Sequence, residues 1–406
     1  MWELIQANKR KSLILIISLG IVLILLGYFF GSFYDPDRGG AVGIFIALML
    51  WLILYVLAYT SGSKILLAVS GAKEVTKDVH PQLYNIVEEM KIAAHLPAMP
   101  KIYIIDSAAP NAFATGLKPE NSAVAVTSGL LARLNRDELQ GVIGHEMSHI
   151  ANRDVLFMTV AGIMLGVIVI LSEIFIRSLW FGGGGRYRSK SSSDSGQAQM
   201  IFLVIAIVFA ILGPIAAQLL YFALSRKREY LADASAVRLT RYPEGLASAL
   251  EKISQNTAEL KSANKVTAAM FIANPLKKKG ERLHNLTSTH PPITERIKIL
   301  RSIAQSANYI DYQNAYNKVK GKKAQLIPKA ELNDTTKIPI LKPEAPGFMG
   351  LTAKQRQRDA GDLVMKVNNY SFINCECGLK IKIPPDYKKN TITCPRCGRV
   401  HSLIKK

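Results

Sequence analysis

Cysteine is missing from the first 374 residues of this 406-residue chain, so disulfide bonds cannot hold most of it together. The chain has four cysteines, and all of them lie within the last 32 residues, at Cys375, Cys377, Cys394 and Cys397. Such a cluster is typical of a metal-binding framework and not of a scattered set of disulfides.

The four cysteines form two short knuckles, at residues 375–378 and 394–398. Two such knuckles resemble a zinc ribbon, in which four thiolates enclose one structural Zn²⁺ and stabilise a domain too small to bury a core. The first knuckle has one residue between its cysteines where two are commoner, so His401 is an alternative ligand. The sequence predicts a structural zinc site but no function for it.

Charged side chains are absent from four long apolar runs, at residues 13–30, 41–59, 155–171 and 200–224. Each run is about as long as the 17–25 residues that a helix needs to cross a bilayer. The sequence therefore predicts an integral membrane protein with four transmembrane helices and excludes a wholly water-soluble one.

A signal-peptide cleavage site is also missing. The first apolar run follows the basic residues Lys9, Arg10 and Lys11, as in a signal peptide, but it is long for one, and residues 29–34 lack a small-x-small pattern. We therefore expect an uncleaved anchor. The basic residues place the N-terminus in the cytoplasm by the positive-inside rule, and the chain returns there after the second span.

Acidic residues are scarce: 30 Asp and Glu stand against 51 Lys and Arg, which gives a formal net charge of +21. From residue 301 onward there are 20 basic and 8 acidic residues, so +12 of that charge lies in the last part of the chain. A basic tail beside a membrane is expected to attract anionic lipid headgroups. Nucleic-acid binding is a second interpretation, which suits a membrane-anchored chain less well.

The stretch GHEMSHI, in the middle of the chain, carries a complete piece of chemistry. Asn135 followed by Glu138 predicts a helix start with a capping box, and apolar residues recur behind it at helical spacing. His145 and His149 are four residues apart and share one helix face, where two imidazoles can hold one Zn²⁺. Glu146 then stands at the general-base position of a zinc peptidase.

A third ligand is needed, and Glu229 is the candidate, with Asp233 four residues later on the same helix face. Glu229 would complete a site of two histidines and one glutamate, with one position left for water. Asp233 would accept the free ring N–H of a liganding histidine. The other interpretation is that both carboxylates only neutralise Arg226 and Arg228. Two bilayer crossings separate His149 from Glu229, so both lie on one side, as a shared site requires.

These motifs, in a chain with two anchors and a membrane hairpin between the motifs, resemble those of the HtpX family of membrane zinc metalloproteases, relatives of the CAAX prenyl endopeptidases. The resemblance covers roughly residues 1–305. It implies a gluzincin-like zinc metalloendopeptidase whose catalytic Zn²⁺ is bound by His145, His149 and Glu229. It also implies Glu146 as the base and Asp233 as the support of a ligand.

The resemblance further implies contacts with the substrate. One stretch resembles the family's edge strand, which pairs with the substrate backbone. The implied substrate-binding residues are Asn111, Ala112, Phe113, Ala114 and Arg296. His290, which precedes two prolines, resembles the histidine that stabilises the tetrahedral intermediate, and His284 competes with it for that role.

The predicted fold is an α+β integral membrane protein, mainly helical, with four transmembrane helices, a zincin-type catalytic domain with a small sheet, and a C-terminal zinc ribbon. Strands are expected at residues 101–106, 111–116 and 122–127. The predicted domains are two N-terminal transmembrane helices (1–62), a first catalytic part with the HExxH helix (63–154), a transmembrane hairpin (155–224), a second catalytic part (225–306), a linker (307–365) and the ribbon (366–406).

The leading functional interpretation is a multi-pass protease of the cell membrane, with its active site facing the cytoplasm, that cleaves membrane or misfolded proteins for quality control. A CAAX-type processing peptidase is one alternative, although its larger set of spans is absent. A non-catalytic adaptor is another, but it has no need of Glu146. The expected cofactors are one catalytic and one structural Zn²⁺. The sequence specifies neither the cleavage motif nor the oligomeric state.

The linker has a low apolar content, several prolines and many lysines, so we expect it to be loosely ordered. Residues 337–341 are a candidate to dock as an added strand on the edge strand at Asn111. The alternative is a solvated tether for the ribbon.

Overall fold

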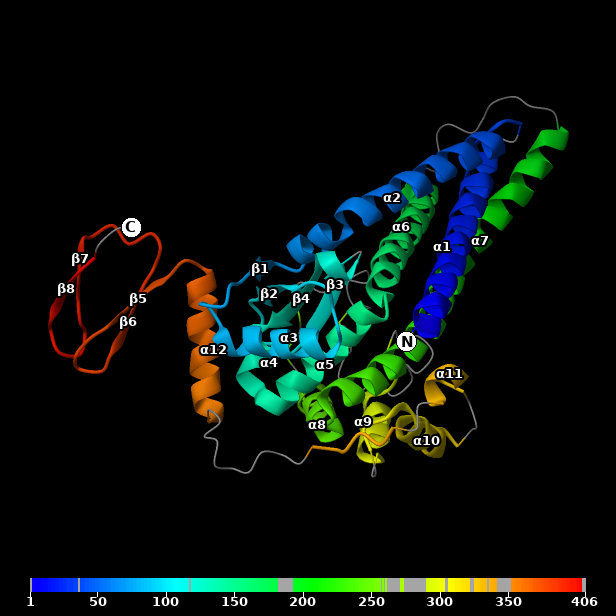
Figure 1. Ribbon diagram of the computed structural model, residues 1–406. Coiled ribbons are helices and arrows are strands. Elements are labelled where there is room, and N and C mark those ends of the chain that lie inside the picture. The colour runs from blue at the N-terminus through cyan, green and yellow to red at the C-terminus, as the bar shows by residue number, and fades with distance from the viewer. Residues whose placement is uncertain are drawn as a thin grey trace.

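The structure is a computed structural model that describes residues 2–35, 37–116, 118–181, 193–256, 258, 260, 271–273, 290–303, 306–321, 325–333, 336–341 and 352–403. The described chain is mainly helical, with one four-stranded sheet and two small hairpins, which confirms the coarse fold prediction. Long helices form an elongated arm, and the sheet with shorter helices forms the body at its base (Figure 1). The two hairpins lie on the side of the body away from the arm.

The helices are α1 (Trp2–Tyr34), α2 (Gly39–Val69), α3 (Pro81–Ala93), α4 (Ser128–Arg133), α5 (Arg136–Ala151), α6 (Asp154–Phe181), α7 (Ser193–Thr240), α8 (Pro243–Ser254), α9 (Ile293–Arg301), α10 (Tyr309–Lys320), α11 (Lys329–Leu332) and α12 (Ala353–Val367). A short 3-10 turn covers Pro119–Asn121.

Helix α5 begins at the capping box that the sequence predicts. The backbone N–H of Glu138 donates to Asn135 Oδ1 at 2.9 Å, and the N–H of Asn135 donates to Glu138 Oε2 at 2.9 Å. Nearly the whole helix beyond this point is buried, because α3, α7, α8 and the sheet pack around it. A helix enclosed on all sides holds its side chains at fixed positions, which a metal site requires.

The sheet has the strand order β1-β2-β4-β3, so β1 (Ala72–Glu74) and β3 (Ala112–Gly116) are its edges. β2 (Lys101–Ile105) and β4 (Ser122–Thr127) are parallel neighbours, and each edge strand is antiparallel to its partner. The three predicted strands are confirmed. β1 escapes prediction because its three residues, Ala-Lys-Glu, show no alternating apolar pattern. β3 is the edge that packs against α5.

The first two helices of the arm form a tight hairpin. Gly27 lies against Gly43, and Gly31 lies against Gly39, so closely that a Cβ on any of the four would collide with the partner backbone. Small residues four apart allow two helix backbones to approach in this way. Among the described residues, two helices are long and apolar enough to cross a membrane, namely Ser12–Tyr34 within α1, and α2.

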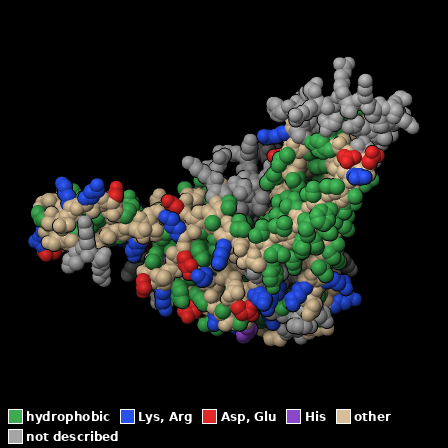
Figure 2. Space-filling view, turned by 90° about the horizontal axis from the view of Figure 1, so that it is seen from above, with side chains coloured by type: hydrophobic (Ala, Val, Ile, Leu, Met, Phe, Trp, Pro, Cys, Tyr) green, Lys and Arg blue, Asp and Glu red, His purple; other side chains and the backbone are tan. Residues whose placement is uncertain are grey.

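Helices α6 and α7 complete the arm and coincide with the third and fourth apolar runs of the sequence. α7 has 48 residues, runs through Pro214 without a break, and ends inside the body. Large hydrophobic side chains are exposed along all four helices, for example Leu25, Phe45, Ile174 and Val208, and Figure 2 shows them as a broad apolar surface over the arm. An exposed apolar surface of this extent suits contact with lipid.

The segment expected to be a loose linker contains helices, and α10 belongs to the main core. Tyr309, Tyr312 and Tyr316 are buried there beside α7 and α9. The expectation of a loose linker is therefore wrong for this part of the chain. Few aliphatic residues occur in the segment, and its buried stripe consists of tyrosines at positions i, i+3 and i+7, which a search for aliphatic periodicity overlooks.

Residues 336–341 also follow a defined path. The N–H of Ala307 donates to the carbonyl of Ile338 at 2.8 Å, and the N–H of Leu341 donates to the carbonyl of Arg241 at 2.9 Å. The segment thus lies along the end of α7 and not on β3. The predicted docking on the edge strand is wrong for these residues, because their backbone groups already pair elsewhere.

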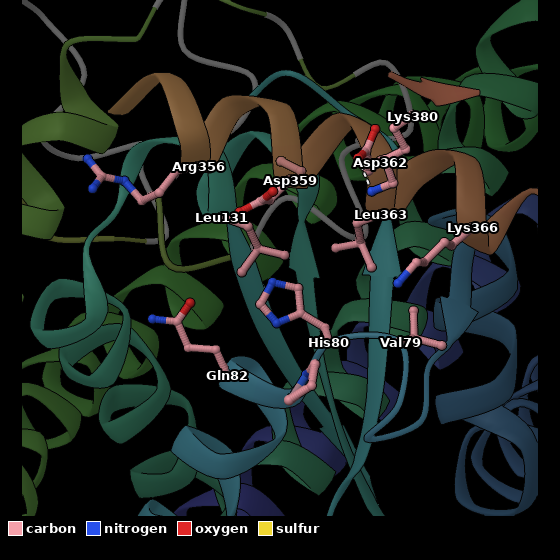
Figure 3. A pocket seen from close by; sticks show the side chains of 12 residues that line it. Val79, His80, Gln82, Leu131, Arg356, Asp359, Asp362, Leu363, Lys366 and Lys380 are labelled. Atoms are coloured by element: carbon pink, nitrogen blue, oxygen red, sulfur yellow. Dashed lines mark hydrogen bonds and ion pairs between the residues drawn. The ribbon is translucent and has the colours of Figure 1, made fainter. Parts of the chain in front are cut away.

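Helix α12 joins the cysteine-containing hairpins to the body. It packs against α4, with Ala360 and Leu363 in the main core. It also borders a cavity of about 250 Å³, which His80 and Leu131 line from the opposite side (Figure 3). Beyond it, β5 (Ser371–Asn374) pairs with β6 (Lys380–Ile383), and β7 (Thr391–Thr393) pairs with β8 (Val400–Ser402). The residues that line this cavity include none of the predicted zinc ligands.

Candidate active site

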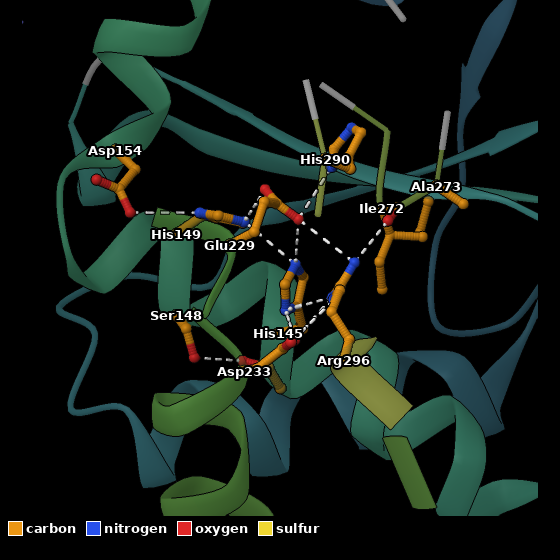
Figure 4. A network of polar contacts seen from close by, with 12 residues as sticks. His145, Ser148, His149, Asp154, Glu229, Asp233, Ile272, Ala273, His290 and Arg296 are labelled. Atoms are coloured by element: carbon orange, nitrogen blue, oxygen red, sulfur yellow. Dashed lines mark hydrogen bonds and ion pairs between the residues drawn. The ribbon is translucent and has the colours of Figure 1, made fainter. Parts of the chain in front are cut away.

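His145 and His149 project from one face of α5, and Glu229 reaches them from α7 (Figure 4). The Nε2 atoms of the two histidines are 3.2 Å apart. Glu229 Oε1 lies 3.4 Å from His149 Nε2, and Glu229 Oε2 lies 3.5 Å from His145 Nε2. All three side chains are buried, so the structure brings the three predicted ligands together inside the body.

The spacing of these atoms fits a zinc ion. Donors that each lie about 2.0–2.1 Å from a tetrahedral Zn²⁺ are about 3.3 Å from one another. The two nitrogens are 3.2 Å apart, close to that edge length, and each lies 3.4–3.5 Å from one oxygen of Glu229, Oε1 for His149 and Oε2 for His145. With three protein donors, one tetrahedral position remains for a water or a substrate, as in catalytic zinc sites.

The charges around the cluster also suit a divalent cation. The buried carboxylates in and around it are those of Glu146, Asp154, Glu229 and Asp233, and the buried arginines are Arg228 and Arg296. With neutral imidazoles, four carboxylates exceed two guanidinium groups by two negative charges. Buried charge without compensation is costly. The two excess negative charges can be balanced by protons on His145 and His149, whose pKa values are raised, or by one Zn²⁺ bound to the neutral rings.

Asp233 supports His145, and Arg296 supports Asp233. The Oδ1 of Asp233 lies 2.9 Å from His145 Nδ1. Arg296 donates through Nη2 to Asp233 Oδ1 at 2.7 Å and through Nε to Asp233 Oδ2 at 2.8 Å. The resemblance grouped Arg296 with the substrate contacts. In the structure its guanidinium is fully buried, is bonded to Asp233, and lies 3.5 Å from Glu229 Oε2, so it contacts residues of the cluster itself.

His149 has a corresponding carboxylate that sequence reasoning missed. Asp154, the first residue of α6, places Oδ2 3.3 Å from His149 Nδ1. Arg228 lies 3.6 Å from the other oxygen of Asp154. A signal for Asp154 exists in the sequence, since it is a lone acidic residue at the start of an apolar run and five residues beyond His149. The contact of Arg228 with Asp154 depends on the tertiary fold, and no sequence pattern predicts it.

The surrounding charges shift the pKa values of the site. Burial lowers the pKa of His149, but hydrogen bonds to Asp154 and Glu229 raise it to about 10. Burial raises the pKa of Glu229, yet His290, His145 and His149 together hold it well below its usual value. Burial likewise opposes ionisation of Asp233, and Arg296 outweighs it, so the pKa of Asp233 is lowered. The site thus favours ionised carboxylates.

Glu146 lies between the cluster and the edge strand. Its side chain is buried, and burial raises its pKa, while His145, His149 and the backbone of Ala114 in β3 partly offset that rise. A carboxylate whose pKa is raised toward neutrality is a better proton acceptor near neutral pH. Glu146 therefore has the environment that a general base needs.

His290 is the third histidine near the cluster. It is buried, and its Nδ1 lies 3.0 Å from Glu229 Oε2. The structure therefore places it beside the metal ligands (Figure 4). Its sequence competitor, His284, lies outside the described residues.

The edge strand is partly covered by the chain itself. The N–H of Ile272 donates to the carbonyl of Ala112 at 2.9 Å, and Asn111 Nδ2 donates to the carbonyl of Ala273 at 2.9 Å. Phe271 packs edge-on against Phe113 with ring centroids 5.1 Å apart. Asn111, Ala112 and Phe113 thus hold residues 271–273, a contact that no sequence pattern predicts.

The cysteines form a second cluster in the terminal hairpins. Cys375 Sγ and Cys397 Sγ are 3.4 Å apart, Cys377 Sγ and Cys394 Sγ are 3.7 Å apart, and all four sulfurs lie within 4.8 Å of one another. Thiolates about 2.3 Å from a tetrahedral zinc would be about 3.8 Å apart. The cysteines share their protons. Burial raises the pKa of Cys394, but backbone N–H groups and the neighbouring cysteines lower it to about 6. A backbone N–H group lowers the pKa of Cys375, but the neighbouring cysteines raise it to about 12. Cys394 is thus the thiol that ionises first, and the thiolate is the form that binds metal.

Comparison with known proteins decides the family. The model of peptidase family M48 matches residues 77–304, which contain both motifs of the histidine–glutamate cluster. The chain belongs to peptidase family M48. The family match ends before α10, so α10, α12 and the cysteine hairpins lie beyond it.

Individual relatives agree with this assignment. The chain is 47% identical to the protease HtpX homolog of Dictyoglomus thermophilum over 310 residues, which cover 76% of this chain and 97% of the relative. It is 44% identical to the homolog of Caldanaerobacter subterraneus over 75% of this chain and 98% of the relative. The resemblance to HtpX proteases is thereby confirmed, and the chain is a membrane metalloprotease of the M48 family.

A solved structure was also matched, more weakly. The crystal structure of S. mikatae Ste24p covers 74% of this chain and 67% of its own, with 21% identity and a TM-score of 0.40. That likeness is too low to support a conclusion about the site.

Proposed function

We propose that this M48 metalloprotease is a zinc-dependent endopeptidase that cleaves membrane proteins or misfolded proteins at the cytoplasmic face of the membrane. The observation that carries the proposal is the buried cluster of His145, His149 and Glu229, whose ligand atoms lie within 4.8 Å of one another, with Glu146 buried beside them. Three donors and an adjacent carboxylate are what metal-assisted peptide hydrolysis needs.

In this proposal His145, His149 and Glu229 hold the zinc ion. When bound, zinc supplies Lewis-acid chemistry, which polarises the carbonyl of the scissile peptide bond and strengthens water as a nucleophile. Glu146 accepts a proton from the attacking water as the new C–O bond forms, and it passes that proton to the leaving amine as the C–N bond breaks. We assign to His290, whose Nδ1 lies 3.0 Å from Glu229 Oε2, the hydrogen bond that stabilises negative charge on the carbonyl oxygen.

The substrate would add to the β3 edge as an extended strand. The carbonyl of Ala112 already accepts a hydrogen bond from Ile272. Pairing with substrate is therefore proposed for the remainder of the strand, from Ala114 to Gly116, which lies nearer Glu146. Misfolded proteins offer such extended segments, which supports the quality-control role.

Four membrane spans are part of the proposal. Helices α6 and α7 carry exposed large hydrophobic side chains as α1 and α2 do, and α7 contains an apolar stretch at Leu203–Leu219. With the N-terminus in the cytoplasm, four spans return both halves of the site to that side. The cysteine cluster would hold the second, structural zinc ion, and the basic tail would face anionic lipids.

The decisive variant is Glu146→Gln. We expect it to lower cleavage of casein at least about 100-fold, because general-base catalysis contributes roughly 10²–10⁴-fold, and to leave zinc content unchanged. Glu88→Gln, at an exposed position on α3, is the matched control and should behave as the wild type. Full activity of Glu146→Gln would refute the proposed role of Glu146. Absence of casein cleavage by the zinc-loaded wild type would favour the adaptor interpretation.

The substrate class needs a second measurement. The inactive Glu146→Gln protein, expressed in its native membrane, should retain uncleaved substrates, which can be identified by mass spectrometry. Membrane proteins and unfolded chains should dominate. A set confined to one short C-terminal motif would favour the CAAX-type processing peptidase.

A further inference from the structure

Three buried polar residues meet where the arm joins the body. Ser12 stands at the start of the apolar part of α1, Asp154 is the first residue of α6, and Arg228 follows the apolar part of α7. Their exposed fractions are 9%, 0% and 3%, so water contributes little to their solvation. Helices α1, α6 and α7 therefore each place one polar side chain at the junction between the arm and the body.

These residues form a continuous chain of contacts that ends at a metal ligand. Arg228 Nη2 donates to Ser12 Oγ at 3.1 Å, and Arg228 Nη1 lies 3.6 Å from Asp154 Oδ1. The other oxygen of that carboxylate, Oδ2, lies 3.3 Å from His149 Nδ1. The guanidinium thus faces one oxygen of Asp154 while His149 faces the other.

Asp154 uses one oxygen for Arg228 and the other for His149, and this pairing orients the imidazole ring of His149. A carboxylate that accepts the Nδ1–H of a histidine sets the tautomer and leaves the Nε2 lone pair for the metal. Arg228 favours this orientation of Asp154, because its guanidinium lies 3.6 Å from Oδ1 and a turned carboxylate would move that oxygen away from the buried positive charge. Ser12, in turn, holds the second nitrogen of the Arg228 fork.

The support of the other histidine does not reach α1. Arg296 forms both of its bonds to Asp233 and a third to the carbonyl of Ile272, all within the body. Each of the two histidines thus faces an aspartate that is paired with an arginine, by two hydrogen bonds at Asp233 and by an ion pair at 3.6 Å at Asp154. Of the two arginines, only Arg228 reaches a residue of the N-terminal membrane helix, namely Ser12.

We infer that Ser12, Arg228 and Asp154 are positioning residues for His149, and that α1 is thereby a structural part of the metal site and not only an anchor. The inference rests on the proposed zinc site of His145, His149 and Glu229. Its consequence is that the packing of α1 against α7 sets how firmly the catalytic metal is held. The terminal cysteine cluster, which touches none of these residues, should be independent of it.

The test measures the rate at which full-length protein, in one membrane mimetic, loses zinc to a chelator. We expect Asp154→Asn and Arg228→Met to release the catalytic ion about 10–100-fold faster, as for residues that support metal ligands. Ser12→Ala should accelerate release several-fold. The ion of the cysteine cluster is the internal reference, and its release should be unchanged in every variant.

Matched controls separate positioning from general damage. Lys227→Met removes the same charge at the exposed neighbouring position, and Ser18→Ala removes a hydroxyl that bonds only within α1, to Ile14. Both should release zinc as the wild type does. Arg228→Lys should restore retention partly relative to Arg228→Met, since an ammonium keeps the charge but cannot span Ser12 and Asp154.

Folding is monitored in the same samples by thermal unfolding. Ser12→Ala should unfold at the wild-type temperature yet release the catalytic ion faster. Wild-type release from Ser12→Ala would overturn the role of α1, and wild-type release from Arg228→Met would overturn the whole arrangement. If Glu229→Ala loses no zinc, the proposed function itself fails, and that result is distinct from either of these.

Discussion

The two candidate metal sites of this protein differ in the structure that positions their ligand atoms. In the first, His145, His149 and Glu229 come from two helices packed in the main core, and aspartates backed by arginines orient the histidines. In the second, four cysteines come from two small hairpins with a core of their own that includes Cys375 and Cys394. The body of the protein positions the first site, whereas the second site holds its own surroundings together.

The number of donors follows the same division. Three donors leave a position for chemistry, and four thiolates leave none. The buried carboxylate of Glu146 lies beside the first cluster. The four candidate ligand atoms of the second cluster are all sulfurs. We therefore expect that the two metals can be removed separately. Loss of the first should abolish activity and leave the fold, whereas loss of the second should unfold the hairpins and leave activity.

The largest expected effect is on the terminal hairpins. Cys394→Ser should unfold residues 371–402, because a structural zinc ion contributes about 10–16 kcal/mol to the folding of small domains. Casein cleavage by the same protein should persist, since the catalytic cluster is separate. Hydrogen exchange of the hairpins, measured beside the protease assay, checks both statements. A parallel loss of activity would show that the ribbon takes part in catalysis.

A smaller effect is expected from shortening the tail. A chain that ends after Ser306 loses Tyr312, which is fully buried, and deletion of a large buried side chain costs about 3–5 kcal/mol. Its melting temperature should fall by several degrees. A chain that ends after Leu341 keeps α10 and should stay active. If the shorter chain were equally stable and faster than the full-length protein, α10 would be an inhibitory segment and not part of the core.

The smallest effect concerns His401, the alternative ligand of the ribbon. The four sulfurs lie within 4.8 Å of one another and form a complete set of donors without it. His401→Ala should therefore keep the structural zinc, whereas Cys377→Ser should lose it. Metal analysis of the two variants after dialysis makes the comparison. Loss of zinc from His401→Ala would show that His401 is a ligand and that the four cysteines are not the complete set.

The sequence predicted the parts of the site that have fixed spacing. His145, Glu146 and His149 lie on one helix turn, and Glu229 with Asp233 repeats the interval of four. Helix geometry alone converts those intervals into shared faces. The capping box of α5 was predictable for the same reason, since it is a local pattern.

The sequence could not predict contacts that depend on tertiary packing. Arg228 reaches Asp154 and Ser12 across three helices, and Ile272 pairs with Ala112 from a segment far along the chain. No fixed spacing in the sequence predicts these contacts. The tyrosine stripe of α10 was overlooked for another reason, namely that its burial uses aromatic residues in a polar, lysine-rich stretch.

One measurement tests the central claim most directly: the zinc content and casein cleavage of full-length Glu229→Ala beside the wild type. The wild type should carry two zinc ions per chain. Glu229→Ala should carry one, retained by the cysteine cluster, and should lack protease activity while the hairpins stay folded. If Glu229→Ala keeps two zinc ions and full activity, Glu229 is not a ligand and the division between the two clusters is wrong.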